Sequence, residues 1–253
     1  MADHVRLTTI CSAMTAVVAV ATGCSEPAPT SPTVSMPNVA LATSAVLPTF
    51  PGATQFVANV SNPYFPLSPG TTFEYSTETA DGVETNTVEV TNRTKKILGV
   101  KATVVHDQVF FDGVLTEDTF DWYAQDTQGN VWYLGEQSCE IQAGQCVSTA
   151  GSWEAGVGGA QPGIIMWADP AAQKGTTYRQ EFFAGEAEDV AKVVGLNASV
   201  DTPYGSFTDC IETVDWSLLE TSSREHKFYC PGTGLVLGVA GGARSELVAI
   251  HSP

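Results

Sequence analysis

Three carboxylates in the segment 117–121 are the first candidates for chemistry. In an extended chain alternate side chains share a face, so Glu117 and Asp121 lie together with Tyr123, while Asp118 lies on the other face. A facing pair of carboxylates can act as acid and base in hydrolysis, or can bind Ca²⁺. The chain carries 28 acidic residues, however, so we favour a solvated strand face for this segment.

The other titratable groups give no catalytic site. Glu186, Glu188 and Asp189 lack the ligand spacing of an EF-hand, and we expect a surface acidic run. His106 and Asp107 are neighbours in sequence and fall on opposite strand faces, so they form no dyad by themselves. No serine has the G-x-S-x-G setting of a nucleophile elbow. The sequence therefore predicts no catalytic residue, no metal site and no cofactor.

The glycine-rich segment 151–163 is the best candidate for a ligand site. It is too rich in glycine for a strand, and long ordered loops in compact domains often carry function. It has no following Lys-Ser/Thr pair, so it does not fit a phosphate-binding loop. Trp153 and Trp167 flank it, and with Glu154 and Gln161 they form the predicted ligand mouth.

Four cysteines beyond residue 24 predict two disulfides. Cys139 and Cys146 enclose a short turn and suit a hairpin staple, and Cys210 is expected to pair with Cys230. Metal ligation is the alternative, but the spacing is not C-x-x-C, so zinc is disfavoured.

The second disulfide fixes a register. If 208–216 and 224–230 are antiparallel neighbours, opposed residue numbers sum to 440, which places Val214 opposite His226.

Residues 1–23 predict an export signal. Arg6 supplies the positive charge, and the apolar stretch 7–21 is too short and too polar for a membrane span. The signal ends in Ala-Thr-Gly-Cys at 21–24, which resembles the lipobox of bacterial lipoproteins, although Ala21 stands where Leu is usual. The resemblance implies lipidation at Cys24, a membrane partner through that anchor and a location in the cell envelope.

Ordinary secretion is the alternative, because Ala19-Val20-Ala21 is an A-x-A cleavage site. Cleavage there would leave an odd number of cysteines and a freely secreted protein. Lipidation at Cys24 leaves an even number, which suits an oxidising compartment, so we favour the anchor.

Beyond the signal the sequence predicts a tether and one domain. Residues 24–58 are rich in Pro, Thr, Ser and Ala, which favours an extended, disordered tether. Residues 59–253 form the β-domain, with hairpin turns at 81–82, 112–113 and 126–130. Segment 186–196 has both helix and strand features, and the neighbouring hairpins favour a strand. The predicted fold is all-β: a strongly curved antiparallel meander sheet or half-barrel.

Parts of the domain resemble known exported proteins. The blocks that carry the resemblance are NPYFPL (62–67) with PGT (69–71), DTFDWYAQD (118–126) with GNVWY (129–133), VDTPYGSF (200–207) and YCPGTGLV (229–236). They resemble uncharacterised secreted bacterial proteins of curved-sheet, half-barrel type, which are similar to periplasmic lipoprotein-carrier folds. The resemblance implies a fold and an exported location, and it brings no assigned catalytic residue.

Charge and organisation together define the expected function. A net charge of -17 argues against nucleic-acid binding, which needs clustered Lys and Arg. We expect an exported, lipid-anchored envelope protein, non-enzymatic, that binds an apolar or amphipathic small molecule or a protein, or has a structural role. The alternative is a secreted hydrolase of envelope polymers that uses carboxylates near Glu117, Asp121 and Glu154.

Overall fold

The computed structural model describes residues 45–253, and this part of the chain is built from β-strands. The predicted all-β class is confirmed. The elements in chain order are η1 (Ala53–Gln55), β1 (Val60–Asn62), β2 (Phe65–Leu67), β3 (Thr72–Glu78), β4 (Val83–Ile97), β5 (Val100–Phe111), β6 (Val114–Gln125), β7 (Val131–Gln142), β8 (Gln145–Ser148), β9 (Trp153–Glu154), β10 (Gln161–Met166), β11 (Thr177–Arg179), β12 (Glu181–Phe182), β13 (Asp189–Thr202), β14 (Gly205–Ser217), β15 (Glu225–Cys230), β16 (Gly234–Ala240) and β17 (Ala243–His251).

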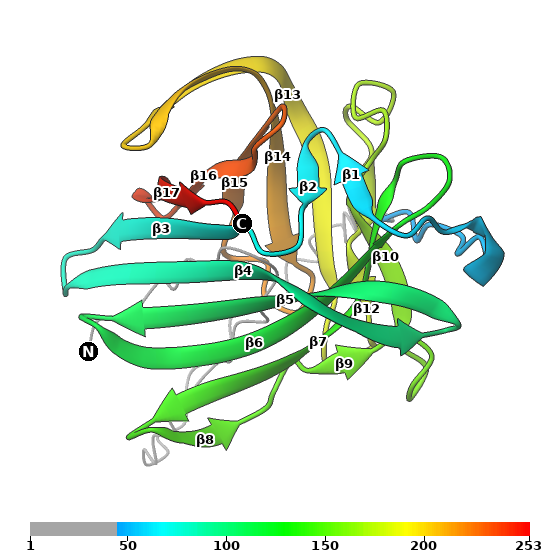
Figure 1. Cartoon of the computed structure of the whole chain (residues 1–253), viewed down its shortest axis with the longest axis horizontal. Helices are drawn as coiled ribbons and strands as arrows, with labels where there is room; N and C mark the ends of the chain where they lie inside the picture. Colours follow the sequence, from blue (N-terminus) through cyan, green and yellow to red (C-terminus); the bar gives the residue numbers. More distant parts are fainter. Residues whose placement is uncertain (1–44) are drawn as a thin grey trace, which may run out of the picture.

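A single 15-stranded sheet contains every strand except β1 and β2. Its order is β11-β13-β14-β15-β16-β17-β3-β4-β5-β6-β7-β10-β12, and β8 and β9 also pair with β7. The long strands β3 to β7 lie side by side and curve, and β13 and β14 arch over the opposite side (Figure 1). Most neighbours in the sheet follow one another in the chain, so the predicted meander is confirmed.

Turn chemistry explains the hairpins. At the β5–β6 turn both Asp112 and Gly113 have positive φ angles, 47° and 78°. A two-residue turn of this kind matches the right-handed twist of the flanking strands, and Asp-Gly tolerates the conformation well. The expected strand around 186–196 also forms, as the first part of β13.

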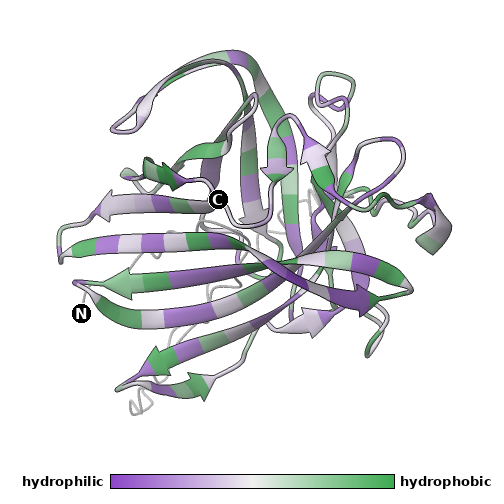
Figure 2. Ribbon diagram, viewed as in Figure 1, coloured by the Kyte–Doolittle hydropathy of each residue, from purple (hydrophilic) through white to green (hydrophobic). Residues whose placement is uncertain are grey.

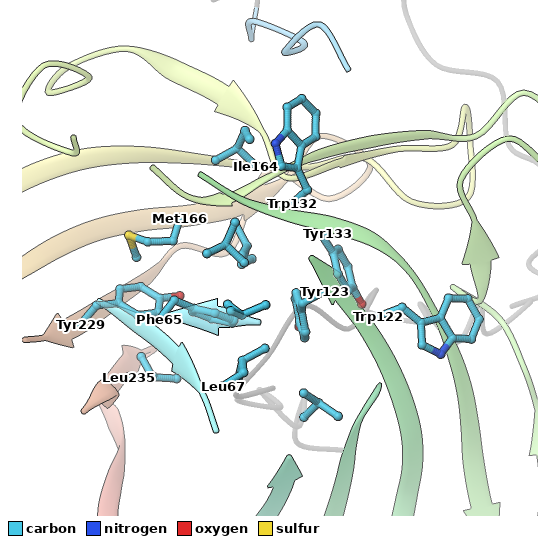
Figure 3. Packing of buried hydrophobic residues seen from close by; sticks show 14 of the residues in the cluster. Phe65, Leu67, Trp122, Tyr123, Trp132, Tyr133, Ile164, Met166, Tyr229 and Leu235 are labelled. Carbon is cyan, nitrogen blue, oxygen red and sulfur yellow. The ribbon is translucent and has the colours of Figure 1, made fainter. Parts of the chain in front are cut away.

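The strands alternate between an inner and an outer face. Hydrophobic and hydrophilic residues alternate along β4 in bands (Figure 2). On the inner face Phe65, Tyr123 and Tyr229 gather with Leu67 and Leu235, whereas Trp122 points away from them (Figure 3). Phe65, Leu67, Tyr229 and Leu235 are each at most 7% exposed, so this half of the interior is mainly apolar.

The β1–β2 hairpin covers this apolar half. The centroid of the Phe65 ring in this hairpin lies 5.2 Å from that of the Tyr123 ring and 6.3 Å from that of the Tyr229 ring. The buried Asn62 side chain donates to the carbonyls of Gly129 (2.9 Å) and Trp167 (3.1 Å), which ties the hairpin to its surroundings. This hairpin is therefore a lid over the apolar half of the interior.

The first described residues lie against the sheet. Composition assigns residues 45–58 to the end of the predicted tether. The rings of Phe50 and Phe56 lie 5.6 and 6.3 Å from Trp132 on the outer face of β7. Further upstream, the signal and Cys24 lie outside the described residues. Between residues 45 and 253, no helix has the length and apolar character needed to cross a membrane.

Both predicted disulfides are present. Cys139 and Cys146 join β7 to β8, and Cys210 and Cys230 join β14 to β15 with their Cα atoms 4.1 Å apart. Val214 lies opposite His226, so the predicted register is confirmed.

One short segment closes the sheet into a barrel. We call Thr177–Phe182 the closing segment. Its first half, β11, pairs with β13 at one edge of the sheet, and its second half, β12, pairs with β10 at the other edge. Gln180 is the residue at which the segment changes edges, and it is buried. Tyr178 of the closing segment also forms a parallel bridge with Val46.

Candidate functional site

The barrel interior also contains a group of carboxyl residues from seven strands, of which five are buried and two, Asp189 and Glu225, are partly buried. We call this group the acidic interior. It comprises Asp107 on β5, Asp121 on β6, Glu136 on β7, Glu181 on β12, Asp189 on β13, Asp215 on β14 and Glu225 on β15. Lys227 is the only lysine or arginine among the buried residues of the described chain. The interior is therefore strongly negative when its carboxyls ionise.

The centre of the acidic interior is a row across three strands. Asp121 lies opposite Glu136, and Glu136 lies opposite Trp153 on β9. The Tyr133 hydroxyl donates to Asp121 Oδ1 at 2.6 Å. The exposed fractions of Asp121, Glu136 and Trp153 are 0%, 2% and 4%, so the two carboxyl groups face each other almost without water.

A glycine makes this row possible. Gly135 has a φ of 129°. A Cβ atom at this position would lie 2.3 Å from the Trp153 carbonyl oxygen, which is too close for any side chain. Gly135 therefore lets β9 approach β7, and Trp153 then packs edge-on against Tyr133 with ring centroids 5.4 Å apart.

Burial raises the pKa of both facing carboxyls. For Asp121 the pKa rises to about 8, because burial outweighs the hydrogen bond from Tyr133, and the charge of Glu117 adds to the effect. For Glu136 burial is again the main cause, and the charges of Asp121, Glu181 and Glu117 raise the pKa further. Both groups therefore hold protons at pH values where an exposed carboxyl is ionised.

Glu181 of the closing segment joins the row from the opposite edge of the sheet. Burial holds its pKa well above the ordinary value, and the charge of Asp189 raises it further. The Trp153 indole lowers that pKa in part, although its Nε1 atom makes no hydrogen bond. The indole N–H therefore lies close to the Glu181 carboxyl group.

Several atoms of the row have no hydrogen-bond partner. They are Asp121 Oδ2, Glu136 Oε2, Glu181 Oε2 and Trp153 Nε1. A buried polar atom that lacks a partner costs about 1–3 kcal/mol, and most buried polar atoms in proteins are bonded. A group with both hydrogen-bond donors and an acceptor would satisfy all of them.

A second set of carboxyls surrounds Lys227. Its Nζ lies 3.5 Å from Asp215 Oδ2 and 3.4 Å from Glu225 Oε2. Burial raises the pKa of Glu225 to about 7 against the opposing charge of Lys227. The pKa of Asp189 rises to about 6, mainly through burial. The single lysine thus offsets only part of the negative charge.

Asp107 completes the acidic interior on the β5 side. The Asn86 side chain donates to its Oδ1 atom. Burial holds the pKa of Asp107 well above its ordinary value, and the charges of Asp121 and Glu117 raise it further.

The residues of the predicted ligand mouth do not meet in one place. Trp153 belongs to the row in the acidic interior. The Glu154 side chain forms a half-exposed salt bridge of 2.8 Å with Lys95, and Gln161 is exposed. Trp167 is partly buried and packs edge-on against Tyr178 of the closing segment, with ring centroids 5.4 Å apart. Of the four residues, only Trp153 lies beside the acidic interior.

Alternation predicted which carboxyls share a face but not which face is buried. Glu117 and Asp121 do face the same way, yet the solvated face that we favoured is wrong for Asp121, because curvature turns this face inward. No sequence pattern pointed to Glu136 or Glu181. A register shift near Gly135 breaks the alternation in β7, and the two-residue strand β12 is too short to show any period.

His106 lies outside the barrel. It bonds to Asp118 at 2.7 Å and stacks on Phe120 with ring centroids 4.3 Å apart. Asp107 points inward, so the two neighbours form no dyad, as predicted. In residues 45–253, no set of three or more His, Cys, Asp or Glu side chains has the arrangement of a metal site.

Comparison with known proteins gives little further information. No protein-family model matches the chain. No curated protein matches it either. Among solved structures, the crystal structure of a "putative lipoprotein" from Parabacteroides distasonis aligns with a TM-score of 0.41 and 10% sequence identity, covering 75% of this chain and 99% of that chain. The function is therefore inferred from the acidic interior itself.

Proposed function

We propose that this protein is an exported, lipid-anchored envelope protein that binds an amphipathic ligand in its barrel without transforming it. The polar end of the ligand is a cationic amine. The observation that carries this proposal is the set of buried, unpartnered oxygen atoms on Asp121, Glu136 and Glu181. An ammonium group donates several hydrogen bonds and carries a positive charge. It would therefore supply both the hydrogen-bond donors and the neutralising charge that these oxygen atoms lack.

The surroundings of the row favour an organic cation. The rings of Tyr123 and Tyr133 stack at 4.9 Å, and Tyr133 packs against Trp153. Aromatic faces beside carboxylates attract ammonium groups through their negative ring quadrupoles. A hydroxyl next to the amine would accept the hydrogen bond that the Trp153 indole offers. The apolar half of the interior, around Phe65 and Tyr229, suits the hydrocarbon part of such a ligand.

Export and anchoring are supported by the sequence. The lipobox-like end of the signal at Cys24 supports an anchored protein, and the paired cysteines of the domain are typical of oxidising compartments. Intact mass spectrometry of the protein from its host tests this part. A mature chain that begins with a lipid-modified Cys24 is expected, and an unmodified N-terminus at Thr22 would overturn the anchor.

Binding is tested with three probes of equal chain length: dodecylamine, dodecanol and dodecanoate. Isothermal titration at pH 7 is expected to give binding of dodecylamine, weaker binding of dodecanol and none of dodecanoate. Glu136→Gln replaces one carboxylate with an amide of similar shape. We expect this substitution to weaken dodecylamine binding at least tenfold. Glu154→Gln, on the outer face, is the matched control. Equal binding of all three probes, or equal affinity in both variants, would contradict a cationic ligand.

A hydrolase is the second candidate, and the facing pair Asp121 and Glu136 favours it. Two carboxyls with raised pKa values can serve as acid and base. Incubation of the wild type with envelope polysaccharide and peptidoglycan, compared with Asp121→Asn, tests it. Product released by the wild type and not by the variant would replace the binding proposal with this one.

A further inference from the structure

Without the closing segment, β10 and β13 would be the two edges of an open sheet. Within the described chain, strand pairing joins these two edges only through the closing segment. It contributes three residues to each edge at most: Thr177 to Arg179 pair with β13, and Glu181 and Phe182 pair with β10. The other junctions between long strands have many more paired residues. The β10–β12 junction, which we call the seam, has two paired residues, the fewest of the junctions that form the barrel, and β7–β10 beside it has three.

Close backbone packing holds the segment at the crossing point. A Cβ atom on Gly163 of β10 would lie 2.4 Å from the Arg179 carbonyl oxygen and 2.5 Å from that of Gln180. The Gln180 amide donates to the Asp189 carbonyl at 2.9 Å, and its side chain donates to Asp215 Oδ2 at 3.2 Å. The segment thus fits into the seam with no space for an added methyl group.

Charged groups lie on the segment and around it. Arg179 within the segment pairs with Glu188 at 3.1 Å, and carboxyls surround Glu181. The charged or titratable groups that interact with Glu181 are Asp189 on β13 and Asp121 on β6, and Glu136 on β7 is in turn affected by Glu181. Asp189 is affected by Asp215 on β14 and Lys227 on β15, and it affects Glu225 on β15. Beyond these, the charge of Glu117 raises the pKa of both Asp121 and Glu136, and the charge of Asp121 raises that of Asp107.

We infer that the closing segment is a proton-dependent latch, which seals the barrel while Glu181 and the carboxyls that face it are protonated and detaches when they ionise. The latch is a property of the protein alone, so it does not depend on the proposed ligand. It goes beyond that function by supplying a route into the interior: detachment of β12 from β10 opens the seam next to Glu136 and Trp153.

Charge repulsion supplies the force. In a low-dielectric interior, like charges repel far more strongly than in water, and Lys227 pairs with Asp215 and Glu225 rather than with Glu181. Detachment exposes Glu181 to water, where its charge is solvated. Raised pKa values, about 6 for Asp189 and about 8 for Asp121, mean that protons favour the closed form. Rising pH therefore favours the open form.

Hydrogen–deuterium exchange of the full mature protein, without ligand, tests the latch. Protection factors are compared at pH 5 and pH 9 after correction for the intrinsic exchange rate. We expect protection of peptides that cover 177–189 to fall at least tenfold at pH 9, while the β3–β4 hairpin keeps its protection. An equal loss in both regions, or no loss at the seam, would overturn the inference.

Variants assign the effect to the carboxyls. Glu181→Gln combined with Glu136→Gln is expected to keep the seam protected at pH 9, whereas Glu154→Gln should behave as the wild type. Gly163→Ala is expected to lower seam protection at both pH values, because its methyl group displaces the segment sterically. A double variant that still opens at pH 9 would contradict the inference. If the double variant does not fold, the wild-type comparison of seam and hairpin still decides the question.

Because no ligand is present in this experiment, its result is separate from the binding test. A stable seam with normal dodecylamine binding would remove the latch and leave the proposed function intact. A seam that opens at pH 9 in a protein that does not bind dodecylamine would support the latch and remove the proposed function.

Discussion

Asp121 on β6 and Glu136 on β7 are direct cross-strand neighbours, and both carboxyl side chains are buried inside the barrel. Like charges at opposed positions destabilise a sheet, and burial removes the water that would screen them. The pair is therefore stable only when a proton or a bound cation neutralises it. This relationship links the stability of the fold, its response to pH and its proposed ligand.

The pair predicts that the protein loses stability as pH rises. A raised pKa in the folded state means that the folded chain binds more protons than the unfolded chain, so stability falls across the interval between the two values. For Asp121 this interval runs from 3.8 to about 8, and for Glu225 it runs from 4.5 to about 7. We expect the thermal midpoint to be higher at pH 5 than at pH 9. Calorimetry in matched ionic strength checks this, and a midpoint that rises with pH would contradict it.

Glu136→Gln is expected to stabilise the protein at alkaline pH. The amide removes one buried negative charge and can donate a hydrogen bond to Asp121, so a gain of about 1–3 kcal/mol is expected at pH 9. At pH 5 the change should be small, because Glu136 is then protonated. Urea unfolding at both pH values measures it, with the outer-face variant Glu154→Gln expected to stay within about 0.5 kcal/mol of the wild type.

Lys227→Met is expected to have the opposite effect. The lysine is 4% exposed and neutralises Asp215 and Glu225. Removing one partner of a buried ion pair costs about 3–5 kcal/mol. The loss should be greater at pH 8 than at pH 5, because Glu225, with a pKa of about 7, is protonated at the lower pH. Equal losses at both pH values would show that packing of the lysine stem, and not charge, sets its contribution.

The two disulfides are expected to differ in strength. The Cys210–Cys230 bond spans 20 residues and Cys139–Cys146 spans 7. Loop entropy predicts losses of about 3 and about 2 kcal/mol for the corresponding double alanine variants. The first variant also leaves a void, since Cys210 and Cys230 are fully buried, which widens the difference. Urea unfolding under non-reducing conditions measures both, and a larger loss at Cys139–Cys146 would count against this ranking.

Gly135→Ala is expected to disturb the row at its centre. The added methyl group would meet the Trp153 backbone, so β9 must shift, at a cost of about 1–3 kcal/mol. Gly144→Ala is the matched control, because Gly144 also has a positive φ, 74°, but has open space around it. Thermal unfolding and near-ultraviolet dichroism are the measurements. Equal effects of the two substitutions would mean that backbone strain alone matters at Gly135.

Local sequence determined the strands, the turns and the disulfide register. The Asp112-Gly113 pair set the β5–β6 hairpin, whereas the predicted turn at 81–82 is a four-residue loop, 79–82, and alternation placed Glu117 and Asp121 on one face. The spacing of Cys210 and Cys230 fixed how β14 and β15 pair. These features depend on contacts between chain neighbours or between adjacent strands, so a sequence pattern can report them.

Only the tertiary structure decided which face became the interior and which residues met there. Alternation gives two faces and does not say which is buried, and that choice depends on how the whole sheet curves and closes. Glu181 reaches Glu136 because the closing segment changes edges at Gln180, 45 residues beyond Gly135. A contact of this kind depends on barrel closure, which is a property of all the strands together and leaves no local signal in the sequence.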